Sequence, residues 1–281
     1  MNMLSWDQVA AMNQHYQKYS FHYFLEQQKK LGIKNLELWL GTPHFYLDRM
    51  GSDNCEKIRD QAEKFGMKIV SVTTPSFAWQ FQYASKNESI RRNGIQYFKN
   101  GIRVAAKLGA GIMTVNSGWG YPGETEKEGF ERSVETLREL AETAKEQNII
   151  LTLESLTSKE SKIGDTLEKI ERIWKAVDSE NLEIMVDTVA LGYQKEELEE
   201  WFKTFGKHLI HMHFIDIDKD KQTDDHLVWG DGSFSLSEMS DILKKYQYKG
   251  YVVQEIAAER YQMNPEKADE RGVRELRKYF K

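Results

Sequence analysis

Short apolar runs alternate with longer amphipathic segments along this whole chain. Eight of the runs have the length of strands, and most are continuously apolar, as is typical of parallel strands buried on both faces. They are Gln8–Met12, Leu36–Leu40, Lys68–Thr73, Gly111–Val115, Ile149–Leu153, Glu183–Val186, Leu209–His213 and Tyr251–Gln254. A strand followed by a helix, repeated eight times, predicts an α/β fold made of one closed parallel barrel, the (β/α)₈ or TIM barrel.

The segments between the runs carry apolar residues at helical spacing. They are Phe21–Leu31, Cys55–Phe65, Ser89–Leu108, Glu126–Gln147, Thr166–Val177, Glu196–Phe205, Leu236–Tyr246 and Pro265–Phe280. Gly32, Gly66 and Gly109 follow three of these segments, at the position where a helix commonly ends with positive φ. An open doubly wound sheet is the alternative, but its usual Gly-x-Gly-x-x-Gly turn is absent from the sequence. We therefore expect residues 1–281 to form a single barrel domain.

Composition narrows the classes of partner. The length of 281 residues suits one barrel, and 39 basic against 44 acidic residues give no basic surface for nucleic acid. Cys55 is the only cysteine, which excludes an intramolecular disulfide and a thiolate metal cluster. No apolar run approaches the about 20 residues that span a membrane, and the first residues do not resemble a secretion signal. We expect a cytoplasmic protein that binds neither nucleic acid nor membrane.

The last four of the eight strand-like runs each end in a residue that can bind a metal ion. These residues are Glu154, Asp187, His213 and Glu255. In a (β/α)₈ barrel, the carboxyl ends of the strands meet at the active-site mouth, so the four side chains would converge on one divalent cation. Three carboxylates and one imidazole suit Mn²⁺, Mg²⁺ or Co²⁺ better than a structural zinc, which prefers thiolates. We expect one divalent metal ion, with Mn²⁺ the first choice and Mg²⁺, Co²⁺, Ni²⁺ or Zn²⁺ as alternatives.

Each of these residues also has an ordinary structural explanation. Glu154 could pair with a nearby lysine, and Asp187 could cap a turn or helix. His211 and His213 alternate on one strand and so face the same side, with His211 one layer deeper, and one of them could be a core histidine. Asp216 is a candidate to orient the following loop or a ligand. Four such coincidences at successive strand ends are less probable than one metal site.

Two of the four candidate metal ligands, both of them carboxylates, could also transfer protons. Glu154 and Glu255 belong to the fifth and eighth runs, so they can flank a substrate that lies over the metal. One carboxylate would remove a proton from a carbon next to a carbonyl, and the other would return it on the opposite face. The metal would bind the carbonyl and hydroxyl oxygens and stabilise the enediolate.

Several stretches resemble the sugar isomerase/epimerase group of the xylose-isomerase-like barrels. They are residues 37–45, 153–161, 185–187, 211–216, 226–232 and 253–255. The likeness is strongest to the fructoselysine 3-epimerases and weaker to the D-tagatose/D-psicose 3-epimerases. It implies an isomerase: a metal-dependent 3-epimerase of a ketose or substituted ketose, or an aldose–ketose isomerase. A small sugar would be its partner, and homodimers or homotetramers are common in this group.

The resemblance also assigns roles to single residues. It implies the same four metal ligands, with Glu154 and Glu255 doubling as the acid/base pair. The residues that it assigns to substrate binding are Trp39, His44, Glu160, Lys219 and His226. Among these, Glu160 matches a carboxylate at the carbonyl end of the sugar, and His226 matches a histidine beside the substrate.

The chain departs from the ketohexose 3-epimerases at two positions. Ala190 stands where those enzymes have a histidine, and Lys219 stands where they have an arginine. The fructoselysine enzymes share the alanine, which favours a substituted ketose over a free one.

Three other functions are alternatives. An inosose dehydratase-like lyase would use the same barrel and metal to eliminate water. An apurinic-site endonuclease would need more metal ligands than seven histidines readily supply, and a basic face. A non-catalytic sugar-binding barrel would have no use for two opposed, metal-bound carboxylates.

Overall fold

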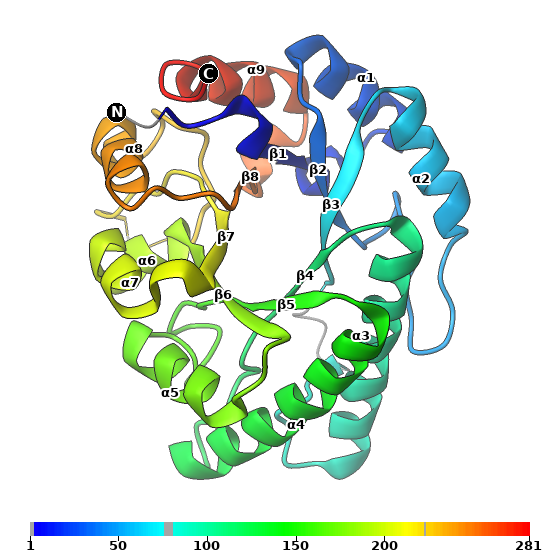
Figure 1. The fold of residues 1–281 in the computed structure, drawn as a ribbon, viewed down its shortest axis with the longest axis vertical. Helices are drawn as coiled ribbons and strands as arrows, with labels where there is room; N and C mark the ends of the chain where they lie inside the picture. Colours follow the sequence, from blue (N-terminus) through cyan, green and yellow to red (C-terminus); the bar gives the residue numbers. More distant parts are fainter. Residues whose placement is uncertain (1–2, 76–80, 222) are drawn as a thin grey trace.

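The strands form one closed barrel. The computed structural model describes residues 3–75, 81–221 and 223–281. Eight parallel strands pair in sequence order, and β1 pairs with β8 to close the barrel (Figure 1). They are β1 Val9–Met12, β2 Asn35–Trp39, β3 Lys68–Thr73, β4 Ile112–Val115, β5 Ile150–Leu153, β6 Leu182–Asp187, β7 Leu209–His213 and β8 Tyr251–Gln254. Every strand begins and ends within one residue of its expected bounds, so the predicted barrel is confirmed.

Helices surround the barrel on the outside (Figure 1). They are α1 Phe21–Leu31, α2 Cys55–Lys64, α3 Glu88–Leu108, α4 Glu126–Gln147, α5 Leu167–Val177, α6 Thr188–Gln194, α7 Leu198–Phe205, α8 Leu236–Lys245 and α9 Pro265–Leu276. Gly32 and Gly109 end α1 and α3 with φ values of 73° and 79°, as expected of helix-terminating glycines. No helix of the described ranges is long and apolar enough to cross a membrane.

Strand alternation divides the side chains between two environments. The buried Leu36 and Leu38 of β2 belong to the large apolar core that the strands share with the helices. Trp39 lies instead with Ala10 and Val253 in a separate small cluster, on the inner side of the barrel. The inward-facing side chains of β2 and β8 therefore lead along the barrel interior to the carboxyl ends of the strands, where the predicted site residues lie.

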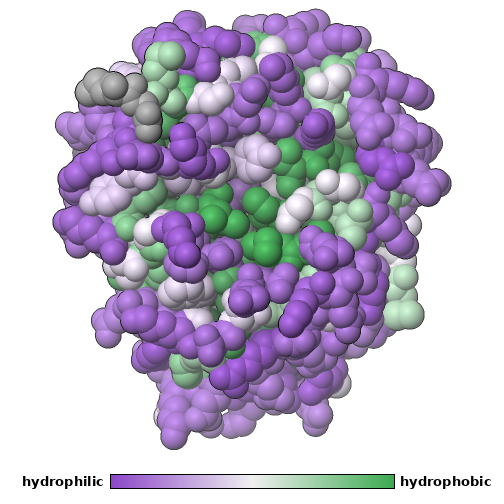
Figure 2. Space-filling model, in the orientation of Figure 1, coloured by the Kyte–Doolittle hydropathy of each residue, from purple (hydrophilic) through white to green (hydrophobic). Residues whose placement is uncertain are grey.

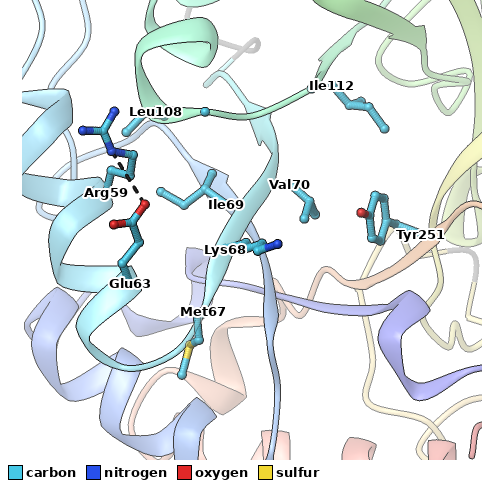
Figure 3. Close-up of a pocket in the computed structure, with 11 residues that line it drawn as sticks. Arg59, Glu63, Met67, Lys68, Ile69, Val70, Leu108, Ile112 and Tyr251 are labelled. Atoms are coloured by element: carbon cyan, nitrogen blue, oxygen red, sulfur yellow. Dashed lines mark ion pairs between the residues drawn. The ribbon is translucent and has the colours of Figure 1, made fainter.

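The amino end of the barrel carries apolar side chains in its middle, within a hydrophilic surround (Figure 2). Figure 2 shows apolar side chains gathered in the middle of one face and ringed by hydrophilic ones. Figure 3 shows a pocket lined by Lys68, Ile112 and Tyr251, which are the first residues of β3, β4 and β8. Arg59 lies 3.8 Å from Glu63 at its edge. None of the predicted site residues lines this pocket, so the chemistry belongs to the opposite, carboxyl end.

Candidate active site

The four predicted metal ligands lie together at the carboxyl end of the barrel. Asp187 and His213 are the last residues of β6 and β7, and Glu154 and Glu255 directly follow β5 and β8. His213 Nδ1 lies 2.9 Å from Glu154 Oε1 and 2.6 Å from Glu255 Oε2. His226 Nε2 joins the remaining ligand to this group, at 3.4 Å from Asp187 Oδ2 and 3.2 Å from Glu255 Oε2.

A hollow of about 310 Å³ opens above these side chains. Its floor includes Glu154, Asp187 and Glu255, and its walls include Trp39 and Leu156. A space of this size, with carboxylates at the base and apolar walls, suits a small polar ligand that has carbon-rich faces.

The donor set fits a divalent metal ion. His213 Nδ1 is buried and makes no hydrogen bond, although two carboxylate oxygens lie within 2.9 Å. Once this nitrogen is deprotonated, its lone pair would bind an ion that the oxygens of Glu154 and Glu255 also face. Ligand atoms of these three residues all lie within 4.8 Å of one another, and the same is true of Asp187, His226 and Glu255. Oxygen atoms with one or two imidazoles are the donors that Mn²⁺, Co²⁺ or Zn²⁺ accept.

A buried acid outside the predicted ligand set, Glu37, holds the histidine in place. Its oxygens accept hydrogen bonds from His213 Nε2 (2.7 Å), His211 Nε2 (2.5 Å), Ser71 Oγ (2.5 Å) and Thr73 Oγ1 (2.7 Å). Burial alone would raise the pKa of Glu37, but the facing imidazoles lower it well below its usual range. Because an ionised Glu37 accepts the hydrogen bond of His213 Nε2, Nδ1 is the ring atom that faces Glu154 and Glu255.

The sequence analysis did not identify Glu37. The available signal was an acid inside the apolar run Leu36–Leu40, at a position whose side chain must face the barrel interior. His211 behaves as predicted, because it lies one layer below His213 on the same side of β7 and shares Glu37 with it.

The two candidate proton-transfer carboxyl groups have different electrostatic environments. Burial raises the pKa of Glu154 to about 7, and the carboxylates of Glu255 and Asp187 add to the effect against the opposing influence of His213. Burial acts on Glu255 as well, but His213 and His226 outweigh it and lower the pKa of Glu255 to about 2. Paired carboxyl groups with opposite pKa shifts are typical of sites that transfer protons.

Asp187 caps α6 with one carboxylate oxygen and keeps the other facing the candidate metal site. Its Oδ1 accepts a hydrogen bond from Val189 N at 2.8 Å and so caps α6. Its other oxygen, Oδ2, faces His226. Capping therefore does not compete with metal binding, because the two use different oxygens.

Three of the five residues predicted to bind substrate line the hollow. They are Trp39, Glu160 and His226. Glu160 is fixed by its Oε2, which accepts hydrogen bonds from Thr157 N at 2.8 Å and Thr157 Oγ1 at 2.9 Å. Burial raises its pKa. These positions agree with substrate contact but do not test it.

The structure does not bring His44 and Lys219 into the hollow. The His44 ring is buried, with Nδ1 at 2.9 Å from Asn13 Nδ2 and Nε2 at 2.9 Å from the Tyr19 carbonyl. Lys219 is exposed, and its Nζ lies over the Phe234 ring at 4.8 Å from the centroid. Substrate contact by these two residues stays a prediction from the resemblance alone.

Asp216 organises the loop that presents His226. It is fully buried, and its carboxylate accepts hydrogen bonds from the backbone N–H groups of Gly230, Gly232 and Phe234, each at 3.0 Å. A Cβ at Gly232 would lie 2.4 Å from Asp216 Oδ1, so this turn requires glycine. Of the two roles considered for Asp216, the structure shows the ordering of the loop.

Comparison with known proteins agrees with the architecture. The fructoselysine 3-epimerase of Shigella flexneri is 27% identical over 245 residues, covering 86% of this chain and 87% of that protein. The D-psicose 3-epimerase of Ruminiclostridium cellulolyticum is 25% identical over 240 residues, covering 84% of this chain and 78% of that protein.

Solved structures share the fold. A D-tagatose 3-epimerase-like protein superposes with a TM-score of 0.79 at 22% identity, covering 96% of this chain and 97% of its own. The IOLI protein with a bound zinc atom superposes with a TM-score of 0.81 at 17% identity, covering 97% and 99%. A family model described as "Xylose isomerase-like TIM barrel" matches residues 25–279. Because that match extends over nearly all of the barrel, the chain belongs to the xylose isomerase-like TIM barrel family.

Proposed function

We propose that this protein is a metal-dependent sugar isomerase that epimerises carbon 3 of a ketose or substituted ketose. The observation that carries the proposal is the pair of carboxylates from β5 and β8, Glu154 and Glu255, which approach the same His213 nitrogen at the base of one hollow. The relatives named fructoselysine and D-psicose 3-epimerases, aligned over more than four fifths of the chain, support the same reaction.

The metal would be held by Glu154, Asp187, His213 and Glu255, and Mn²⁺ is the proposed ion. A bound divalent ion would polarise the carbonyl and the neighbouring hydroxyl, which makes the proton on carbon 3 easier to remove. Glu37 contributes by keeping His213 oriented, with Nδ1 facing Glu154 and Glu255.

The chain's own carboxylates carry the proton. One of Glu154 and Glu255 removes it from carbon 3, and the other, on the far side of the substrate, delivers a proton to the opposite face. The roles exchange when the reaction runs in reverse. Glu160 and His226 bind sugar hydroxyls, while Trp39 and Leu156 cover the carbon faces and exclude water.

Deuterium exchange tests this function. A panel of ketoses is incubated in D₂O with the Mn²⁺-loaded protein, with a chelated sample as the control. Exchange at carbon 3 with formation of the epimer is expected. Exchange at carbon 1 or 2 would indicate aldose–ketose isomerisation, and loss of water would indicate the lyase. No exchange at carbon 3 from any ketose would contradict the proposal.

A homodimer or homotetramer in the cytoplasm belongs to the same proposal. Light scattering of the purified protein would test the assembly, and cell fractionation would test the location.

A further inference from the structure

Trp39 forms part of the wall of the candidate active-site hollow, and its position is set from two sides. It is the last residue of β2 and lines the hollow. A Cβ at Gly41 would lie 2.1 Å from two carbon atoms of the Trp39 ring, so the ring lies directly against the Gly41 backbone. The other support acts on the backbone of Trp39 itself. Any movement of this backbone therefore moves the wall of the hollow.

The backbone of Trp39 is held by the side chain of Asn13. Asn13 directly follows β1 and is buried. Its Oδ1 accepts a hydrogen bond from Trp39 N at 2.7 Å, and its Nδ2 donates to the Trp39 carbonyl at 3.3 Å. The regular pairing of β1 with β2 ends at Met12 and Glu37. The Asn13 amide therefore continues the connection between the two strands up to the mouth of the barrel.

His44 supplies the remaining partner of the same amide. Its Nδ1 lies 2.9 Å from Asn13 Nδ2, and its Nε2 lies 2.9 Å from the Tyr19 carbonyl oxygen. Because Asn13 Oδ1 already accepts from Trp39 N, the group that faces His44 is the NH₂ group, which can only donate. His44 Nδ1 is therefore the acceptor, and the proton of the neutral ring lies on Nε2, which donates it to the Tyr19 carbonyl.

The surroundings of His44 favour this neutral ring. The side chain is buried, with 4% of the residue exposed. Burial lowers the pKa of His44, and the backbone carbonyls of Tyr19 and Tyr16 oppose only part of this effect. A proton on Nδ1 would face the Asn13 NH₂ group, donor against donor, and would break the bond that Asn13 needs. Neutral His44 thus completes the hydrogen bonding of the amide that holds Trp39.

The carbonyl that binds the other side of the ring is itself fixed. Tyr19 lies in the segment between β1 and α1, and its OH donates to the Met263 carbonyl at 2.7 Å, in the segment between β8 and α9. Its ring stacks on Tyr23 of α1, with 4.9 Å between the centroids. His44 is therefore anchored to a fixed acceptor through Nε2 and presents Nδ1 to Asn13 in one orientation.

We propose that His44 is a positioning residue, which accepts a hydrogen bond from Asn13 and thereby fixes the Trp39 wall against which the substrate packs. This inference rests on the proposed function, in which Trp39 covers a carbon face of the sugar. It gives His44 an indirect role in place of the substrate contact that the resemblance implies. The candidate metal ligands belong to the ends of β5 to β8, so a displaced wall weakens substrate binding and leaves these ligands in place.

Two variants of His44 separate its two hydrogen bonds. The side-chain oxygen of asparagine reaches the position of Nδ1, so His44→Asn keeps an acceptor for Asn13 and loses the donor to Tyr19. The amide nitrogen of glutamine reaches the position of Nε2, so His44→Gln keeps the donor and loses the acceptor. His22→Ala removes an imidazole from an exposed position of α1 and is the control.

Hydrogen exchange of the Trp39 backbone N–H reads the hold on the wall without any need for activity. Mass spectrometry with electron-transfer fragmentation measures it on the Mn²⁺-loaded protein. His44→Gln should speed this exchange at least about fivefold, because the buried Asn13 NH₂ group then lacks an acceptor. His44→Asn should stay closer to the wild type, and His22→Ala should match it. A residue that only fills space would show no such difference between asparagine and glutamine.

Kinetics test whether the position of the wall matters for the substrate. With deuterium exchange at carbon 3 of D-fructose, His44→Gln should raise KM at least about fivefold and leave kcat within about twofold, since only binding by the wall is weakened. Mn²⁺ affinity should stay within about twofold of the wild type. Faster exchange of the Trp39 N–H without a change in KM would overturn the positioning role.

The remaining outcomes separate this role from the proposed function. Equal protection of the Trp39 N–H in wild type and His44→Gln overturns the role of His44, and so does equal loss of protection in His44→Asn and His44→Gln. If the wild type exchanges carbon 3 of no ketose, the proposed function fails and the amide exchange still decides whether His44 holds Trp39. If His44→Gln does not fold, ¹⁵N NMR of the wild-type imidazoles at pH 7 decides, and a proton on His44 Nδ1 overturns the role.

Discussion

At the scale of residues, the orientation of the His213 ring follows from one buried carboxylate. Glu37 occupies His213 Nε2, so only Nδ1 can face Glu154 and Glu255. The placement of His211 below His213 was predictable, because strand residues two apart share a face. The hydrogen-bond partner of His213 was not predictable, because Glu37 and His213 are 176 positions apart and only the closed barrel brings them together.

Glu37→Gln tests this orienting role. The glutamine amide cannot accept all four hydrogen bonds that Glu37 accepts. Its NH₂ group would also face the donor groups of His211, His213, Ser71 and Thr73, so the His213 ring loses its fixed position. We expect metal affinity to fall by about 10- to 100-fold, as for other partners of metal-bound histidines. Titration calorimetry with Mn²⁺ measures it. Ser71→Ala removes only one of the four bonds and should have a smaller effect, and an unchanged affinity in Glu37→Gln would be evidence against the role.

Asp187 and His226 should respond differently to substitution. Asp187→Asn can keep the oxygen that caps Val189 N but loses the charge, so Tm should hold while metal binding and activity fall together. His226→Ala should mainly raise KM, because we place this ring beside the substrate. Metal content by atomic absorption and steady-state kinetics check both variants. Loss of metal from His226→Ala would instead make His226 a ligand.

At the scale of elements, strands were predictable to within a residue because both their faces are buried and their sequences are continuously apolar. Short helices were harder to predict from the sequence. The sequence analysis missed α6, which has seven residues and begins directly after β6 without a loop. The last helix was expected to reach Phe280 but ends at Leu276, because Phe280 forms a bridge with Leu4 instead of another helical turn.

The loop from β7 to α8 depends on Asp216. Asp216→Ala would leave several buried backbone N–H groups without an acceptor, and each costs about 1–3 kcal/mol. We expect a clear fall in Tm and a raised KM, since the loop also presents His226. Thermal unfolding measures the first and kinetics the second. The exposed pair of Asp218 and Lys221 offers the control, because Asp218→Ala should change Tm little.

At the scale of the whole molecule, closure of the barrel is what assembles the site. The convergence of the four strand-end residues was predictable from barrel geometry alone, since the carboxyl ends of all strands meet at one mouth. The positions of the loop residues that were assigned from the resemblance could not be predicted in the same way. Lys219 lies on an exposed stretch over Phe234 and His44 is turned away into a buried network, because loop paths depend on packing that strand patterns do not encode.

The central claim is that two carboxylates move a proton at carbon 3, one on each face. Deuterium exchange from each epimer separately, with Mn²⁺-loaded Glu154→Gln and Glu255→Gln, measures it most directly. Glutamine keeps an oxygen for the metal but removes the base, so we predict retained metal and interconversion slowed by at least about 10²–10⁴-fold. Each variant should still exchange the proton of one epimer, and the two variants should differ in which one. Interconversion at nearly the wild-type rate by either metal-loaded variant would contradict the two-carboxylate mechanism.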